Sequence, residues 1–156
     1  MIREKRHRLA YEVYRGSRAV SITACVKKRV SFFTTEARFA IFEGMLLDAL
    51  KKFQCEAEVY LFMPDHAHLL LRGKCETSDI LGAMRAFKQK SGFWLSCHHS
   101  SVRWQKDYYD HILRSDEALE KHVFYILNNP VRKGIVENWK KYPFKGSTVY
   151  NLDDWD

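Results

Sequence analysis

The sequence predicts an α+β fold in which an antiparallel sheet is covered by helices. Two kinds of pattern lead to this class: short segments in which apolar and polar residues alternate, and longer segments in which apolar residues recur every three or four positions. Alternation is typical of half-buried strands, and the longer spacing is typical of amphipathic helices. Each element is taken below in chain order.

The first half of the chain predicts a strand, a helix and a hairpin. Residues 19–27, AVSITACVK, alternate apolar and polar side chains and predict a strand. Thr34 and Thr35 then offer a helix cap before an apolar stripe that ends near Gln54. Two short apolar runs, 57–63 and 66–71, flank a Pro-Asp pair that favours a turn, so they predict an antiparallel hairpin.

The second half begins with another helix and another strand. Ser78 is expected to cap a helix whose apolar residues again lie three and four apart. Gly92 is expected to weaken or end this helix, because glycine is a poor helix former. Residues 103–113, RWQKDYYDHIL, are rich in aromatic side chains and predict a strand.

The last predicted helix begins at Ser115 and Asp116 and ends at about Asn129, because Pro130 disfavours helical backbone at the residue before it. The first six elements in order are strand, helix, strand, strand, helix and strand. That order matches the ferredoxin-like β-α-β-β-α-β sandwich, with the last helix added at its C-terminal end. Since this fold supports many unrelated functions, function must be inferred from a site.

Composition favours an anionic partner. The 156 residues carry a formal charge of +7 with a sequence pI near 9.3, and 14% of them are aromatic. Positive charge attracts nucleic acids or membrane surfaces, and exposed aromatic rings suit stacking on unpaired bases. Because no lipidation motif or amphipathic anchor is evident, a nucleic acid is preferred and no membrane partner is expected.

Length predicts one domain over residues 1–156, within which 1–17 form a basic N-terminal arm and 145–156 a C-terminal tail. The N-terminal segment has no apolar run of the kind found in secretory signals. No stretch approaches the roughly 18 apolar residues of a membrane span. A cytoplasmic protein is therefore expected.

Two histidines on the second strand of the hairpin are candidate metal ligands. Side chains two apart on a strand point to the same face, so His66 and His68 would present neighbouring imidazoles to one divalent ion. Seven histidines in 156 residues give roughly 0.3 such pairs by chance. The spacing alone therefore leaves open a pair of hydrogen-bonded structural histidines.

Tyr125 and Asn129 are candidate catalytic and metal-binding residues on the last helix. They lie four apart and away from the apolar stripe, so both are available to a site. A phenol becomes an effective nucleophile when a metal or positive charge stabilises its anionic form. Tyr108 and Tyr109 are rival nucleophiles, although adjacent tyrosines on a strand more often pack or stack on bases.

Other polar residues are weaker candidates. His111 could orient a ligand or phosphate from outside the metal shell, and a structural histidine is an equally good interpretation. Several cations could contact DNA phosphates, although each taken singly is more often a solvated surface charge. They are Arg85, Lys88, Arg114, Arg132 and Lys133.

A family resemblance connects these patterns. PDHAHLLL, WQKDYYDHILRSDEALEKHVFYILNNPVRKGIVE and YRGSRAVSITACVKKRVSFFT resemble the REP-associated tyrosine transposases, relatives of the single-tyrosine insertion-sequence transposases of the HUH superfamily. The resemblance extends from about Lys5 to Phe144. Its most specific elements are the two hairpin histidines together with the Y-I-x-x-N-P-V segment at the end of the last helix.

The resemblance implies a site and a reaction. His66, His68 and Asn129 would bind Mg²⁺ or Mn²⁺, and Tyr125, on a catalytic helix, would attack the scissile phosphate of single-stranded, hairpin-forming DNA. The products would be a 5'-phosphotyrosine and a free 3'-hydroxyl, which can reverse the attack and join strands. Insertion-sequence relatives act as dimers and REP-associated ones can be monomers, so the expected state is a monomer or homodimer.

Two other functions remain open from the sequence. A catalytically inactive nucleic-acid-binding module with a ferredoxin-like sheet would share the basic charge and the aromatic residues. It would not require the four candidate site residues to meet. An ordinary metal phosphodiesterase that uses water as the nucleophile would form no covalent adduct.

Overall fold

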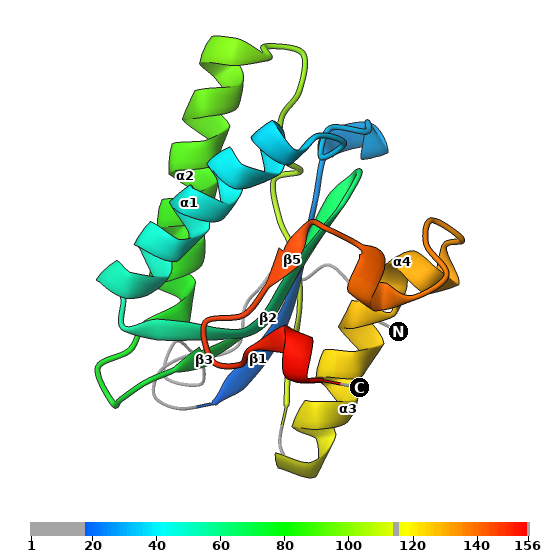
Figure 1. The fold of residues 1–156 in the computed structure, drawn as a ribbon. Helices are drawn as coiled ribbons and strands as arrows, with labels where there is room; N and C mark the ends of the chain where they lie inside the picture. Colours follow the sequence, from blue (N-terminus) through cyan, green and yellow to red (C-terminus); the bar gives the residue numbers. More distant parts are fainter. Residues whose placement is uncertain (1–17, 114–115, 156) are drawn as a thin grey trace.

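A five-stranded antiparallel sheet forms the centre of the molecule, in a computed structural model that describes residues 18–113 and 116–155 (Figure 1). The strand order is β4-β1-β3-β2-β5. Its first four strands have the order of the predicted ferredoxin-like fold, and β5 is an addition that the sequence did not indicate. The bounds are β1 Ala19–Cys25, β2 Cys55–Met63, β3 His66–Gly73, β4 Tyr109–Ile112 and β5 Lys145–Gly146.

Helices cover both faces of the sheet. Helices α1 (Glu36–Lys52) and α2 (Ile80–His98) lie together on one face, and α3 (Asp116–Leu127) and α4 (Asn129–Arg132) lie on the other (Figure 1). Short 3-10 turns are formed by Lys27–Arg29, Trp139–Lys141 and Leu152–Asp154. Within residues 18–113 and 116–155, every helix is too short or too polar to cross a membrane.

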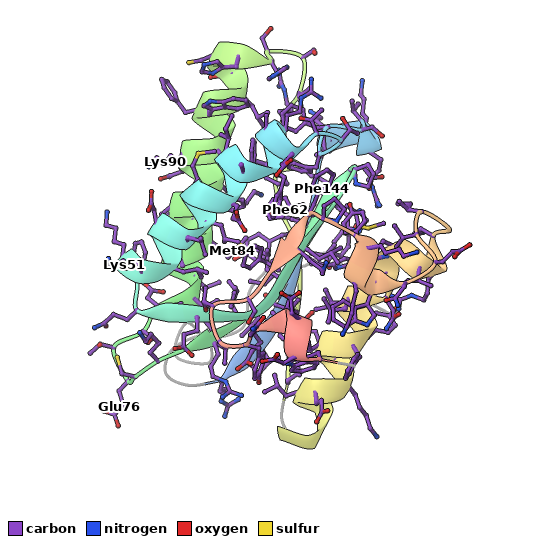
Figure 2. All side chains as sticks on the ribbon, in the orientation of Figure 1. Lys51, Phe62, Glu76, Met84, Lys90 and Phe144 are labelled. Carbon is purple, nitrogen blue, oxygen red and sulfur yellow. The ribbon has the colours of Figure 1, made fainter. Side chains whose placement is uncertain are left out.

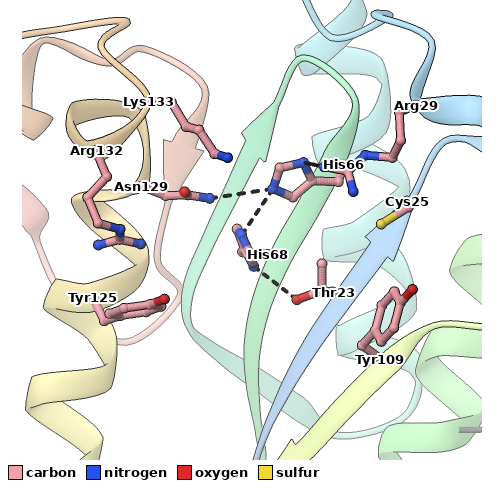
Figure 3. Close-up of a pocket in the computed structure, with 10 residues that line it drawn as sticks. All are labelled: Thr23, Cys25, Arg29, His66, His68, Tyr109, Tyr125, Asn129, Arg132 and Lys133. Atoms are coloured by element: carbon pink, nitrogen blue, oxygen red, sulfur yellow. Dashed lines mark hydrogen bonds between the residues drawn. The ribbon is translucent and has the colours of Figure 1, made fainter. Parts of the chain in front are cut away.

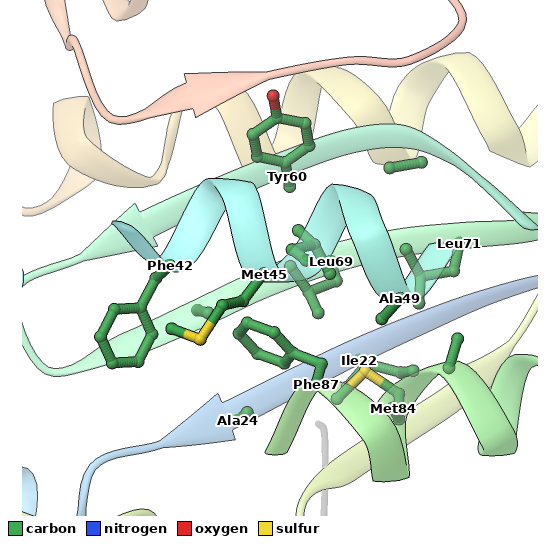
Figure 4. Packing of buried hydrophobic residues seen from close by; sticks show 14 of the residues in the cluster. Ile22, Ala24, Phe42, Met45, Ala49, Tyr60, Leu69, Leu71, Met84 and Phe87 are labelled. Atoms are coloured by element: carbon green, nitrogen blue, oxygen red, sulfur yellow. The ribbon is translucent and has the colours of Figure 1, made fainter. Parts of the chain in front are cut away.

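The main hydrophobic core lies between the sheet and the α1–α2 layer (Figure 4). Phe42 of α1 and Phe87 of α2 are completely buried there, and they meet aliphatic side chains of β1 and β3 such as Ile22 and Leu69. As predicted, Thr35 caps α1, and its hydroxyl accepts a hydrogen bond from the amide of Arg38 at 3.2 Å. Burial of the apolar stripe and this cap together explain why the segment forms a helix.

Helix α2 differs from its prediction at both ends. Asp79, not Ser78, is the cap, and its carboxylate accepts from the amide of Gly82 at 2.9 Å. The Ser78 hydroxyl is fully buried and instead accepts from the amides of Lys74 and Cys75, which closes the preceding turn.

The helix also continues through Gly92 to His98, so the predicted end at Gly92 is wrong. Tertiary contacts outweigh the low helix propensity of glycine here. The Trp104 indole donates to the Ser91 hydroxyl at 2.8 Å, and this bond fixes the helix at the turn that contains Gly92.

The predicted strand over residues 103–113 is mostly a loop. Only Tyr109–Ile112 pair with β1, and Trp104 forms an isolated bridge with Val26. Between them, the amide of Gln105 donates to the carbonyl of Cys25 at 2.8 Å, but residues 106–108 belong to no strand of the described part of the chain. Aromatic content alone therefore overestimated the strand length.

The last helix ends earlier than predicted and a second one follows. Helix α3 ends at Leu127, Asn128 leaves helical geometry with ψ of 1°, and Asn129 begins α4 with Pro130 in its first turn. Proline has no amide hydrogen and fits the first turn of a helix, so it starts α4 as well as interrupting α3. Ser115, the other predicted start residue, lies outside the described residues.

Residues 145–155 pack against the rest of the fold. Strand β5 pairs with β2, and the amide of Phe62 donates to the carbonyl of Phe144 at 2.8 Å, so these two residues lie close together (Figure 2). Farther along, the Trp155 ring lies 5.0 Å from that of Phe124 on α3. This segment covers the sheet beside α3 and thereby helps to fix that helix.

Candidate active site

The α3 side of the sheet has a polar region where β1 and β3 lie next to each other. In the antiparallel register, His68 lies opposite Thr23 and His66 lies opposite Cys25, and all four point toward α3 and α4. A cavity of about 590 Å³ separates them from these helices (Figure 3). Its lining consists of Thr23, Cys25, Arg29, His66, His68, Tyr109, Tyr125, Asn129, Arg132 and Lys133.

The two histidines turn their Nε2 atoms toward each other, 3.0 Å apart. Each ring is held from behind through its Nδ1 atom. His66 Nδ1 donates to the Asp65 carboxylate at 2.6 Å, and Thr23 Oγ1 lies 3.1 Å from His68 Nδ1. These partners favour the tautomers in which both Nε2 atoms carry a free lone pair, as metal ligation requires.

Burial lowers the pKa of both imidazoles. For His68, burial and then the nearby His66 and Arg132 lower the pKa to about 3. For His66, burial lowers the pKa although the hydrogen bond to Asp65 opposes the shift. Both rings are therefore neutral at pH 7, the state in which histidine binds metals.

Asn129 and Tyr125 reach the cavity from two helices rather than from one. Asn129 is buried at the start of α4, and its amide nitrogen lies 3.4 Å from His66 Nε2. Tyr125 on α3 is 56% exposed, and its hydroxyl points from the helix toward the sheet (Figure 3). The Arg132 guanidinium packs on the phenol face, 3.9 Å from the ring centroid, and so restrains the ring.

Arg29 reaches the cavity through an unusual backbone conformation. Lys28 and Arg29 have φ values of 60° and 55°, in the left-handed region that non-glycine residues rarely adopt. The Arg29 side chain donates from Nε to the Asp65 carboxylate at 2.9 Å, and its Nη2 atom lies 3.2 Å from His66 Nδ1. Backbone strain of this kind is commonly kept at functional sites, where surrounding contacts offset its cost.

The arrangement of these donors fits a divalent ion. Two ligands at right angles around an ion, with bonds of about 2.1 Å, are separated by about 3.0 Å, and His66 and His68 Nε2 have that separation. Rotating the Asn129 amide by 180° would exchange its nitrogen for its oxygen and offer a third donor. The described residues contain no cluster of three His, Cys, Asp or Glu side chains able to hold a metal, which makes this amide the candidate for a third protein ligand.

The other predicted site residues are distributed over both faces. Arg132 and Lys133 line the cavity. His111 is exposed on β4, and its ring lies 6.3 Å from that of His122, outside the cavity lining. Arg85 and Lys88 belong to α2 on the opposite face, and Arg114 lies outside the described residues.

Several residues that contact the two histidines, in the cavity lining or just behind it, were not selected from the sequence. Arg29, Asp65 and Thr23 contact the two histidines directly. Asp65 directly precedes the His-x-His pair, and Thr23 shares a predicted strand face with Cys25. Both positions could therefore have been selected as site candidates from the local sequence. Arg29 lies 37 residues before His66 in the chain. Only the tertiary fold brings these two residues together.

Comparison with known proteins points to one family. Residues 17–129 match the family model described as "Transposase IS200 like". The chain is 29% identical over 102 residues to the "Putative REP-associated tyrosine transposase" of Haemophilus influenzae, a match covering 57% of each protein. It is 27% identical over 89 residues to the "REP-associated tyrosine transposase" of Escherichia coli, covering 57% of this chain and 52% of that protein. The chain thus spans somewhat over half the length of these relatives.

A solved structure has the same fold. A REP-associated tyrosine transposase bound to a REP hairpin superposes with a TM-score of 0.73 at 22% identity, over 90% of this chain and 81% of that one. The family model covers most of the chain and includes both histidines, Tyr125 and Asn129. This chain therefore belongs to the IS200-like transposase family.

Proposed function

We propose that the protein is a metal-dependent endonuclease and strand transferase that acts on single-stranded, hairpin-forming DNA through Tyr125. The observation that supports this most strongly is the convergence of four side chains on one cavity. His66 and His68 approach within 3.0 Å, Asn129 lies 3.4 Å from His66, and Tyr125 lines the same space. A module that only binds nucleic acid would not require this convergence.

The proposed reaction conserves a high-energy bond. The Tyr125 oxygen attacks the scissile phosphorus, the bond from phosphorus to the 3' oxygen breaks, and the DNA 5' end becomes linked to the tyrosine. The phenol loses one proton to water and the departing 3' oxygen gains one. Since the new phosphotyrosine is itself a phosphodiester, a 3'-hydroxyl can reverse the step and join strands without ATP.

Bound Mg²⁺ or Mn²⁺, held by His66, His68 and Asn129, would withdraw charge from a non-bridging phosphate oxygen. The donor set combines two imidazole nitrogens with one amide oxygen. Because Mg²⁺ prefers oxygen ligands, and Mn²⁺ accepts imidazole more readily, we propose Mn²⁺ as the more effective of the two ions.

The charge of the cavity suits a phosphate. Arg29, Arg132 and Lys133 are among its lining residues, and no carboxylate belongs to that lining in the described part of the chain. The Asp65 carboxylate lies behind His66 and is paired with Arg29. Such a surface attracts a polyanion and holds its backbone, while the two neutral histidines remain available as ligands.

Hairpin DNA is proposed as the substrate because the structurally similar transposase was solved bound to a REP hairpin. The cavity is lined by this one chain, so a monomer contains every proposed catalytic group. A homodimer that exchanges α3 would build the same cavity from two chains.

Mixing the protein with a hairpin oligonucleotide and Mn²⁺ tests the proposal. We expect a covalent protein–DNA adduct on denaturing gels that disappears in Tyr125→Phe and persists in Tyr109→Phe, which alters the other tyrosine of the cavity. Loss of the adduct only in Tyr109→Phe would identify a different nucleophile. Cleavage without an adduct would indicate a phosphodiesterase that uses water, and binding without cleavage an inactive binding module.

A further inference from the structure

A second cavity of about 370 Å³ lies on the opposite face of the sheet, between α2 and the segment before β4. Leu81 and Met84 of α2 contribute apolar surface, and the ring of Tyr108 contributes an aromatic one. Arg85 and Lys106 add positive charge, and both are exposed. The volume falls in the range of about 300–1,000 Å³ typical of small-ligand pockets.

The pocket is held in shape by Lys88. Its ammonium donates to the carbonyls of Gln105 at 2.8 Å and Lys106 at 3.0 Å, which ties the segment before β4 to α2. The same ammonium lies 5.5 Å from the centre of the Tyr108 ring. Tyr108 is therefore held in place before any ligand arrives, which reduces the entropy lost on binding.

The pocket adjoins the active site around the edge of the sheet. Tyr108 and Tyr109 are consecutive residues: Tyr108 lines this pocket and Tyr109 lines the catalytic cavity. Strand β4 is at the end of the strand order, and no described strand pairs with its outer side. A DNA strand that leaves the catalytic cavity over β4 therefore has to pass around the edge of this one strand to reach the pocket.

We infer that this pocket binds an unpaired nucleotide of the same DNA strand that the active site cleaves. The base would stack on Tyr108 and lie over Leu81 and Met84, and the adjoining phosphate would contact Arg85 and Lys106. An aromatic ring in the pocket lining beside two exposed cations is the combination that single-strand binding proteins use. The inference rests on the proposed function and adds to it a place where single-stranded flanking DNA is held.

The test measures how affinity depends on the single-stranded flank, in a Tyr125→Phe background where DNA is not cleaved. Fluorescence anisotropy compares a blunt hairpin with hairpins that carry one to six unpaired nucleotides on either side. We expect affinity to rise about tenfold once the flank reaches the pocket, since stacking of one base contributes on that order. Arg85→Ala and Lys106→Ala should each lower affinity for the flanked hairpin, because each removes a phosphate contact, and leave binding of the blunt hairpin unchanged.

Lys90→Ala is the matched control. Lys90 is on the same helix, its side chain is 64% exposed, and it is not in the pocket lining (Figure 2). The Lys90→Ala variant removes one positive charge, as the pocket variants do, and should preserve the gain in affinity that the flank provides. The pocket variants should also lower the dependence of log affinity on log salt by about 0.7 per cation on the flanked hairpin.

Photo-crosslinking locates the base. An iodouracil placed in the flank should crosslink to Tyr108 at one position, and circular dichroism should show that all variants remain folded. Equal affinity for blunt and flanked hairpins, or an equal loss in Lys90→Ala and Arg85→Ala, would overturn the inference. The wild-type adduct assay separates this failure from failure of the proposed function. If flanked hairpins form the Tyr125 adduct while Arg85→Ala and Lys106→Ala do not change their affinity, only the pocket is refuted.

Discussion

The two faces of the sheet differ where β1 and β3 lie side by side, although the same strands form both. There one face is apolar and the other is polar, while elsewhere the second face packs apolar side chains such as Val59, Leu61 and Leu70 against α3. On β3, Leu69 and Leu71 point into the α1–α2 core and are fully buried, whereas the neighbouring His66 and His68 point toward α3 and α4. On β1, Ile22 lies in the same core while Thr23 lies beside His68. Because successive side chains of a strand point to opposite faces, one sequence serves packing and chemistry at once.

This division shows what fixes the geometry of the candidate site. A shift of one residue in the register between β1 and β3 would bring the apolar side chains to the site face and the histidines to the core. Burial of the apolar set strongly opposes such a shift. The α1–α2 core therefore stabilises the site without contributing any residue to the cavity lining.

The largest expected effect comes from the core face. Leu69→Ala should lower the free energy of unfolding by about 2–5 kcal/mol, because Leu69 is fully buried and its truncation leaves a cavity. Urea unfolding followed by circular dichroism measures this change. Ile135→Ala also shortens an aliphatic side chain, but at a position that is 47% exposed, so it should cost less than about 1 kcal/mol. Equal costs would mean that the core does not dominate stability.

Periodicity predicted the fold well where one face of an element is buried. The strand at 19–27, helix α1 and the hairpin formed in the expected places, because their patterns agree with how they pack. The end of α2 at Gly92 and the strand at 103–113 were wrong. In both cases tertiary partners decided the outcome. Trp104 supports the helix at Ser91, and only four residues of the 103–113 segment, those of β4, pair with β1.

Local sequence patterns indicated part of the site and missed the rest. The strand spacing of His66 and His68 and the pair Tyr125 and Asn129 could be read directly, although the family resemblance was needed to connect them. The break at Asn128 could not be read, so Asn129 was expected on the same helix as Tyr125. Arg29 was missed because its route into the cavity depends on left-handed backbone that no local signal predicted.

A second expected effect distinguishes the site face from the core face. His68→Ala should weaken Mn²⁺ binding about 100-fold or more, since it removes one of the two imidazole donors. It should change the free energy of unfolding by no more than about 1 kcal/mol, in contrast to Leu69→Ala. Isothermal titration calorimetry and urea unfolding measure the two quantities. His98→Ala is the control, because that histidine is exposed at the end of α2 and should leave both unchanged.

The smallest expected effect concerns the support behind the ligands. Asp65→Asn preserves the side-chain shape and the backbone carbonyl that accepts from the amide of Val26. It removes the negative charge of the carboxylate, which accepts from His66 Nδ1 at 2.6 Å and pairs with Arg29. Mn²⁺ affinity should fall by about 10- to 100-fold, the usual cost of losing a partner behind a metal ligand. Titration calorimetry measures this change.

Asp48→Asn provides the comparison for Asp65→Asn. Asp48 is a carboxylate on α1 whose side chain is 76% exposed and pairs with Lys90 at 3.8 Å, so its loss should not change Mn²⁺ affinity. If Asp65→Asn binds Mn²⁺ as tightly as Asp48→Asn, then Thr23 and burial alone suffice to orient the two rings. If only Asp65→Asn is weakened, the turn between β2 and β3 contributes to metal binding as well as to the hairpin. The site face would then depend on a charge held in place by the strained backbone at Arg29, and not only on the apolar packing behind the sheet.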